Sequence, residues 1–139
     1  MNYLLDTCVI SEVIKKDPEK SVIRWLASVD EFSTYLSVFS LGEIQKGIAR
    51  LDTSRKKQTL KTWLDEDLRI RFSNRLLGFD ANMALKWGEV TGSLEKKGLN
   101  IPLMDSLIAA TALTHDLIVV TRNGKDMEPM GVKIINPWN

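Results

Sequence analysis

The stretch Leu117-Ile118-Val119-Val120-Thr121 decides the fold of this sequence. An unbroken β-branched and apolar run of this length is typical of a strand that is buried on both faces of a parallel sheet. Tyr3–Leu5 opens the chain with another apolar run, and further strands are expected at Phe32–Val38, Leu76–Phe79 and Val132–Ile135. Because helical patterns separate these runs, the alternation predicts a three-layer α/β/α domain with a mostly parallel central sheet of about four or five strands.

The composition is that of one ordinary folded domain, which we expect to span residues 1–139. Apolar residues make up 44% of the chain and charged residues 27%, close to the averages for globular domains. The single cysteine, Cys8, excludes an internal disulfide, and one His with one Cys excludes a structural zinc site, which needs about four such ligands. We find no signal peptide and no run of ~18 apolar residues. The sequence therefore predicts a cytoplasmic protein with no membrane partner.

Polar residues next to apolar runs predict where the helices begin. Asp17-Pro18 reads as an N-cap followed by proline at the first helical position. Ser40, Ser54 and Asp80 are expected to open three more helices, and another is expected to start near Pro102.

The two consecutive helices after Ser40 and Ser54 are expected to form an arm. Their apolar residues exceed what one face of a sheet covers, so a partner segment or a second subunit is expected to pack on them. These residues are Ile44, Ile48, Leu51, Trp63 and Leu64.

Three acidic residues stand at the starts of elements and not on outer helix faces. Asp6 follows the first strand, and Glu43 and Asp105 lie in the first turns of predicted helices. Carboxyl ends of parallel strands meet at one edge of a sheet, so we expect the three carboxylates to converge there. Converging carboxylates raise each other's pKa, and hard cations such as Mg²⁺ or Mn²⁺ relieve the repulsion. The pattern predicts a metal site.

Each acid also has a purely structural interpretation, which the sequence leaves open. Asp6 is suited to cap the following helix, and Ser40-x-x-Glu43 matches a capping box. Asp105 would complement the helix dipole, although its apolar neighbours Met104 and Leu107 argue for a buried position, where an unpartnered carboxylate is strongly disfavoured.

A fourth site residue is expected in Thr121–Asp126, after the strongest strand. Both Asn123 and Asp126 are placed to reach the crevice. Asn123-Gly124 is also an ordinary turn dipeptide and Asp126 an ordinary loop acid, so the sequence does not choose between them.

Basic residues gather at three places in a chain whose net charge is only +1. This pattern fits either phosphate contacts or solvated helix faces. Lys46 and Arg50 lie one or two turns beyond Glu43 and are candidates for holding a substrate phosphate. The other two of these three groups are Arg55, Lys56, Lys57 and Lys61, and Arg69, Arg71 and Arg75.

With these motifs the chain resembles the PIN-domain ribonucleases, specifically the VapC and FitB branch of toxins from bacterial toxin-antitoxin pairs. The resemblance spans the whole chain, with Cys8 where Asn is more usual. It rests on Tyr3–Glu12, Ser40–Ile48, Asp105–Ala112, Thr121–Asn123 and Asn136–Trp138.

The resemblance implies a PIN-like domain that acts as a metal-dependent endoribonuclease toxin, with Asp6, Glu43 and Asp105 binding Mg²⁺ or Mn²⁺. It further implies an RNA substrate, a cognate antitoxin protein and a homodimer. Many relatives have an aspartate where this chain has Asn123. Either Asn123 ligates through its amide oxygen, or Asp126 substitutes for that aspartate, or the site has three acids; we expect Asn123 to face the site and Asp126 to support the loop. A cation at such a site lowers the pKa of a bound water for in-line attack on a phosphodiester.

The alternative is a non-catalytic or phosphoacceptor α/β binding module whose acids are structural or regulatory. A phosphoacceptor receiver domain places an acidic pair after the first strand and a lysine after its last functional strand. Here Thr7-Cys8 follows Asp6, and Arg122 follows Thr121. A module whose acids only cap helices predicts no loss of activity when those acids are neutralised.

Overall fold

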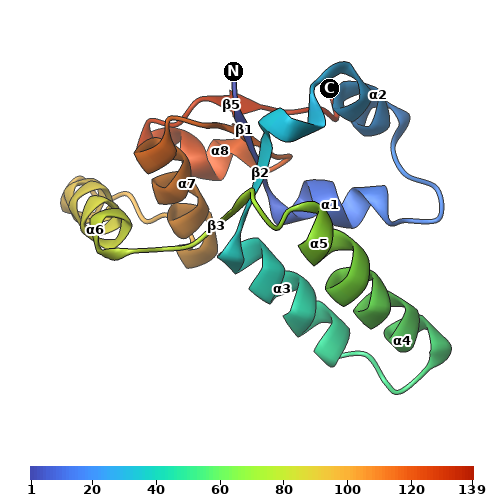
Figure 1. Ribbon diagram of the computed structural model, residues 1–139. Coiled ribbons are helices and arrows are strands. Elements are labelled where there is room, and N and C mark those ends of the chain that lie inside the picture. The colour runs from blue at the N-terminus through green and yellow to red at the C-terminus, as the bar shows by residue number, and fades with distance from the viewer.

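A five-stranded sheet lies at the centre of the computed structural model, which describes residues 1–139 (Figure 1). The strand order is β3-β2-β1-β4-β5, and every neighbouring pair is parallel. The sheet confirms the predicted architecture and settles the number of strands. The strands are β1 (Tyr3–Leu5), β2 (Thr34–Ser37), β3 (Leu76–Leu77), β4 (Ile118–Val120) and β5 (Ile134–Ile135).

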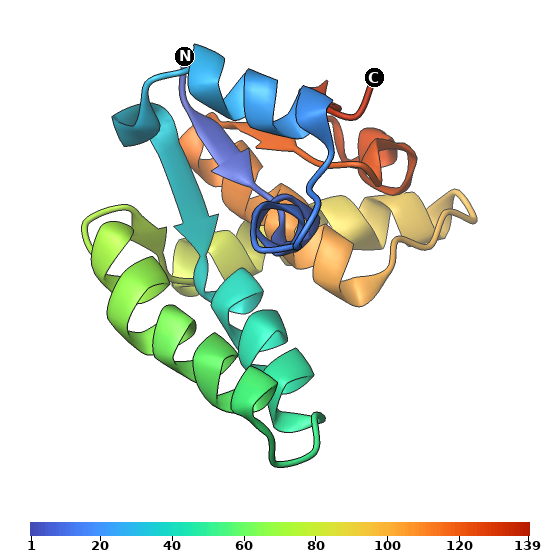
Figure 2. The same cartoon turned by 90° about the vertical axis from the view of Figure 1, so that its right-hand side faces the viewer.

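Helices cover both faces of this sheet and form an arm beside it. Figures 1 and 2 show α6 and α7 on one side of the sheet, α1 and α2 on the other, and α3 to α5 projecting from the body. No helix is both long enough and apolar enough to cross a membrane. The α-helices are α1 (Thr7–Val13), α2 (Lys20–Ser28), α3 (Val38–Ala49), α4 (Arg55–Thr62), α5 (Arg69–Arg71), α6 (Ala81–Lys96), α7 (Leu103–His115) and α8 (Gly124–Met127). The shorter elements are the 3₁₀-helices η1 (Glu31–Ser33) and η3 (Glu128–Met130) and the π-helix η2 (Trp63–Leu68) between α4 and α5.

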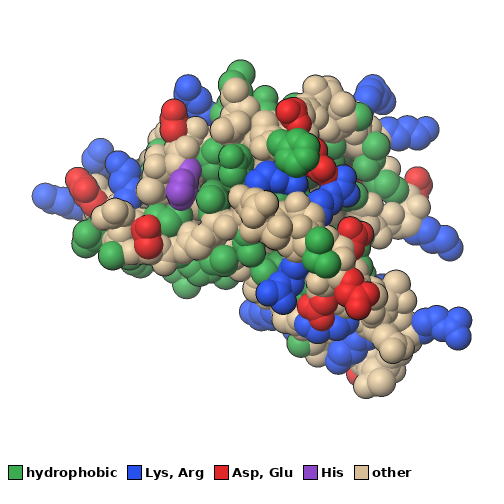
Figure 3. Space-filling view, viewed as in Figure 1, with side chains coloured by type: hydrophobic (Ala, Val, Ile, Leu, Met, Phe, Trp, Pro, Cys, Tyr) green, Lys and Arg blue, Asp and Glu red, His purple; other side chains and the backbone are tan.

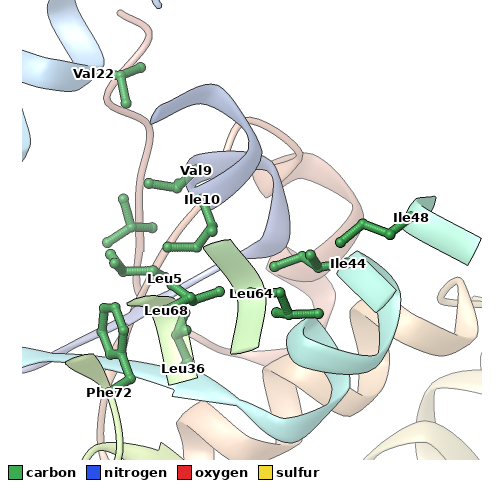
Figure 4. Close-up of a cluster of buried hydrophobic side chains, with 11 residues drawn as sticks. Leu5, Val9, Ile10, Val22, Leu36, Ile44, Ile48, Leu64, Leu68 and Phe72 are labelled. Atoms are coloured by element: carbon green, nitrogen blue, oxygen red, sulfur yellow. The ribbon is translucent and has the colours of Figure 1, made fainter. Parts of the chain in front are cut away.

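Two hydrophobic cores form because consecutive residues of a strand point to opposite faces of the sheet. Leu5 belongs to the core under α1, α2 and α3, part of which is drawn in Figure 4. Leu4 belongs to the core under α6 and α7. The register of the sheet keeps the two cores separate. Leu4 pairs with Val119, which belongs to the same core, and Leu5 pairs with Val120, which belongs to the other.

The arm does not offer the apolar surface that the sequence predicted. Ile44, Ile48 and Leu64 are buried in the core beneath α1, and Leu51 and Trp63 are half-buried. The prediction of a partner surface on these residues is therefore wrong for most of them. In the arm, α3 contacts both α1 and α4, and these contacts cover the apolar side chains.

Two of the predicted helix starts are also wrong. The second helix begins at Lys20 with Glu19 as N-cap, so Asp17-Pro18 remains in the preceding loop. Glu12 stabilises this arrangement because its buried carboxylate accepts the backbone N–H of Glu19 at 2.9 Å.

The other wrong start changes how Glu43 is interpreted. The N-cap of α3 is Ser37, whose hydroxyl accepts the N–H of Phe39 at 3.0 Å. Ser40 lies inside the helix and is not a cap, so the capping-box interpretation of Ser40-x-x-Glu43 is excluded. The predicted caps Ser54 and Asp80 are confirmed.

Candidate active site

Asp6 leaves β1 at the edge where the strands end, and its carboxylate accepts three hydrogen bonds, one of them from the Cys8 thiol. Its Oδ1 accepts the N–H of Thr7 at 2.8 Å, and its Oδ2 accepts the hydroxyl of Thr121 at 2.7 Å. The side chain is the N-cap of α1, and only 6% of the residue is exposed. The capping role predicted as an alternative is therefore present. Since each carboxylate oxygen accepts more than one bond, this role leaves capacity for a ligand.

Glu43 reaches across from α3 to the same edge. Its Oε1 accepts the hydroxyl of Thr7 at 2.7 Å, and the residue is half-buried. The carboxylate thus turns toward the β1–α1 junction and away from the start of its own helix. Glu43 and Asp6 are thus linked through Thr7, although the sequence analysis assigned the start of α3 three residues too late.

Asp105 lies in the first turn of α7, as predicted, and its carboxyl group is electrostatically disfavoured. Its pKa is raised from 3.8 to about 6, mostly by burial and then by the negative charges of Asp6, Asp126 and Glu43, in that order. The side chain makes no hydrogen bond within the protein. Acids from four separate elements therefore act on one another across the crevice.

The segment after β4 contains both residues that the sequence left open as the fourth site residue, Asn123 and Asp126. The backbone N–H of Asn123 donates to the hydroxyl oxygen of Thr121 at 3.0 Å, while its side chain is exposed and makes no hydrogen bond. Asp126 is exposed in α8, and its charge acts on the Asp105 carboxyl more strongly than that of Glu43. Asp126 therefore adds a negative charge that acts on Asp105.

The donor set fits a hard divalent cation in its chemistry, because every side chain offers oxygen. None of the ion pairs in the structure involves Asp6, Glu43, Asp105 or Asp126, so no protein cation neutralises them. No three His, Cys, Asp or Glu side chains lie close enough together to hold an ion. Binding one ion to three of these carboxylates therefore requires them to move closer together.

A groove of about 360 Å³ extends from Glu43 along α3 and past Met104 of α7. Glu43, Lys46 and Arg50 have the i, i+3, i+7 spacing of one helix face, and all three line the groove. Gly42 and Gly47 line it too, and a Cβ at either position would meet no atom within 4 Å. The groove is therefore open beside the acids.

The basic residues that were candidates for phosphate contacts differ in whether they already bind other groups of the protein. Lys46 and Arg50 are exposed and form no ion pair. Arg71 pairs with Glu31, whereas the buried Arg75 donates to the backbone carbonyls of Thr34 and Arg71 at 2.8 Å each. Figure 3 shows acidic and basic side chains intermixed over the arm. Arg75 therefore has a structural role, and the pair on the groove is free to bind an anion.

Three hydroxyl residues and one thiol at the site were missed by sequence reasoning. Thr7 and Ser40 bond to each other near Glu43, and Thr121 bonds to Asp6. Cys8 Sγ lies 3.8 Å from Asp6 Oδ2, and burial followed by the Asp6 charge raises the pKa of this thiol. The thiol therefore stays protonated at neutral pH and is no nucleophile. The available signal was their place in the motifs Tyr3–Glu12, Ser40–Ile48 and Thr121–Asn123.

We expect Asp105→Asn to stabilise the cation-free protein near pH 7.5. The carboxyl titrates near 3.8 in the unfolded chain and at about 6 in the folded one, so the folded state binds more protons between these values. Stability is therefore lost as pH rises through this window and stays lost above it. After allowance for solvent screening the gain is about 1 kcal/mol, measured by urea unfolding in EDTA.

The same measurement near pH 4.5 should show a clearly smaller difference between this variant and wild type, because most of the loss occurs above that pH. Asp52→Asn, which neutralises an exposed acid of the arm, is the matched control and should change stability little at either pH. An Asp105→Asn protein no more stable than wild type near pH 7.5 would contradict the electrostatic account.

Comparison with known proteins identifies the family. Residues 3–131 match the PIN domain family. The chain is similar to toxin FitB of Neisseria gonorrhoeae, with 35% identity over 136 residues and 98% of each chain covered. It is similar to VapC ribonuclease Y4jK of Sinorhizobium fredii, with 30% identity over 135 residues, 97% of this chain and 96% of that protein. The crystal structure of FitAcB from Neisseria gonorrhoeae superposes with a TM-score of 0.94 at 34% identity, covering 99% of both chains. The chain therefore belongs to the PIN domain family, among relatives named VapC and FitB.

Proposed function

We propose that this protein is the ribonuclease toxin of a toxin-antitoxin pair and hydrolyses RNA phosphodiesters with Mg²⁺ or Mn²⁺ held by Asp6, Glu43 and Asp105. The observation that carries the proposal is that Thr7 bonds to both Asp6 and Glu43, which come from separate elements, while burial and the neighbouring carboxylates raise the pKa of Asp105. Helix capping alone does not require acids to face one another, whereas a cation site does. Two similar proteins are named toxin FitB and VapC ribonuclease, and the family match argues against a phosphoacceptor domain.

The protein's own residues supply position and charge to this chemistry. When bound, the cation lowers the pKa of a water and offsets the charge that develops on the phosphate. Asp6 is held on both oxygens, and Glu43 is held on one. Asp105 has no hydrogen-bonding partner and is free to rotate toward a ligand. We assign Asp126 as the fourth acid, with Asn123 anchoring the loop through its backbone bond to Thr121.

The substrate contacts proposed here lie on α3. Lys46 and Arg50 follow Glu43 on the face that lines the groove, so an RNA strand that reaches the acids passes both cations. Each unpaired cation on such a path replaces a counterion of the phosphate backbone and makes binding depend on salt.

Two protein partners complete the proposal. A ribonuclease that acts on the RNA of its own cell must be restrained, and we infer a cognate antitoxin that covers the site. We also infer a homodimer, because Leu85 of α6 and Leu103 of α7 are 72% and 63% exposed. Light scattering on the protein alone and after co-expression with the neighbouring reading frame measures both assemblies. A monomer in both samples would contradict this inference.

The proposal predicts that purified wild type cleaves RNA in Mg²⁺ or Mn²⁺ and that EDTA abolishes the cleavage. Asp6→Asn preserves the size of the side chain and removes a charged ligand, so its kcat should fall by roughly 10²-fold or more. Gel-resolved cleavage of a labelled RNA measures both effects.

Glu19→Gln is the matched control, because it removes an exposed acid at the N-cap of α2, away from the crevice. It should cleave like wild type. Equal cleavage by wild type and Asp6→Asn, with or without EDTA, would show that the acids are structural.

A separate prediction concerns the groove. In an Asp6→Asn background, which binds without cleaving, Lys46→Gln and Arg50→Gln should each weaken RNA binding and each reduce the slope of log K against log salt by roughly 0.7–1. Fluorescence anisotropy over a salt series measures this slope. The exposed Lys96 at the end of α6 supplies the control substitution Lys96→Gln, and identical slopes in all variants would place the RNA elsewhere.

A further inference from the structure

Thr7 contacts two of the candidate metal-binding acids at once. Its backbone N–H donates to Asp6 Oδ1 at 2.8 Å, and its hydroxyl oxygen lies 2.7 Å from Glu43 Oε1. Asp6 follows β1 and Glu43 lies in α3, so local chain geometry does not fix one carboxylate relative to the other. Thr7 provides that link.

The hydroxyl of Thr7 lies between two oxygen atoms. Thr7 Oγ1 has one proton and two neighbours, Ser40 Oγ at 2.9 Å and Glu43 Oε1 at 2.7 Å. Thr7 is the donor in both contacts, and because an ionised carboxylate only accepts, its single proton is shared between Glu43 and Ser40. Ser40 and Glu43 therefore hold the Thr7 hydroxyl between them.

Ser40 favours this one arrangement strongly. The residue is fully buried in α3, and its hydroxyl makes no hydrogen bond except to Thr7. A buried hydroxyl without a partner would cost roughly 1–3 kcal/mol. Because Thr7 is β-branched, few χ1 rotamers are open to it, and Ser40 selects the one that reaches Glu43.

The hydroxyl of Thr7 can be removed without disturbing Asp6. The bond to Asp6 comes from the backbone of Thr7, and Thr121 donates independently to Asp6 Oδ2 at 2.7 Å. A substitution that removes only the hydroxyl therefore releases Glu43 and leaves Asp6 in place.

We propose that Thr7 is a positioning residue that, supported by Ser40, holds the Glu43 carboxylate beside Asp6 so that both acids ligate one cation. Glu43 Oε2 makes no hydrogen bond and is the oxygen left for the cation. The inference rests on the proposed function because it assigns Thr7 its role relative to that cation. Loss of a partner that orients a metal ligand typically weakens metal affinity roughly 10–100-fold.

The test measures Mn²⁺ binding to the full chain by electron paramagnetic resonance of the free ion. Thr7→Val preserves the shape of the side chain and should bind Mn²⁺ roughly 10–100-fold more weakly, whereas Thr7→Ser should bind close to wild type. The kcat for RNA should fall in Thr7→Val while KM stays unchanged, because Lys46 and Arg50 are untouched. Ser40→Ala should have a smaller effect, since Thr7 still has its proton.

Thr91→Val is the matched control. Thr91 is also half-buried, and its hydroxyl donates to the backbone carbonyl of Trp87 within α6, away from the acids. Its loss should leave Mn²⁺ affinity and kcat unchanged. If circular dichroism shows that Thr7→Val is unfolded, Thr7→Ala removes the same hydroxyl without the branch and has the same expected result.

The outcomes separate this inference from the proposed function. A folded Thr7→Val or Thr7→Ala that binds Mn²⁺ like wild type overturns the positioning role. Weaker Mn²⁺ binding in the variant supports the role even if wild type fails to cleave RNA, a failure that would overturn only the proposed function. A wild type that binds no Mn²⁺ overturns both.

Discussion

The position of β1 between β2 and β4 is the constraint on which the site depends. The ladder to β4 extends one residue beyond the strand, because the N–H of Asp6 donates to the carbonyl of Val120 at 3.0 Å. Since all three strands are parallel, Asp6, the start of α3 and Thr121 leave the sheet at the same edge. A slip of one residue in register would exchange the faces of Leu4 and Leu5 and turn Asp6 away. The two cores therefore hold the site in place.

The acids at this edge differ in how they are held. Asp6 and Glu43 accept bonds from neutral donors, which orient a carboxylate without cancelling its charge. Asp105 has no such bond, and burial and the neighbouring acids raise its pKa to about 6. This edge of the sheet therefore carries two carboxylates held by hydrogen bonds and a third, Asp105, whose negative charge is unfavourable without a cation. That charge lowers the stability of the folded protein, and a structural role alone does not account for it.

The fold followed from the sequence because its signals are local. The apolar runs at Tyr3–Leu5 and Leu117–Thr121 and the caps Ser54 and Asp80 depend on near neighbours, and the structure bears them out. The start of α3 was missed because two serines fit the capping pattern, and only the end of β2 at Ser37 decides between them.

The rest of the candidate site depends on contacts between distant residues. The bond between Thr7 and Glu43 joins residues 36 positions apart, so no spacing rule reveals it. The effect of Asp126 on Asp105 likewise arises only when α8 packs near α7. Apolar residues such as Ile44 suggested an open arm because the sequence does not show that α3 packs against α1.

The central claim is that these carboxylates share one cation, and the pKa of Asp105 measured by carbon-13 NMR tests it most directly. Without divalent ions the pKa should lie at about 6, because burial and the charges of Asp6, Asp126 and Glu43 oppose ionisation. In saturating Mg²⁺ it should fall by at least roughly one unit relative to KCl of the same ionic strength, since the cation favours the charged form. The same pKa in Mg²⁺ and in KCl would contradict the account.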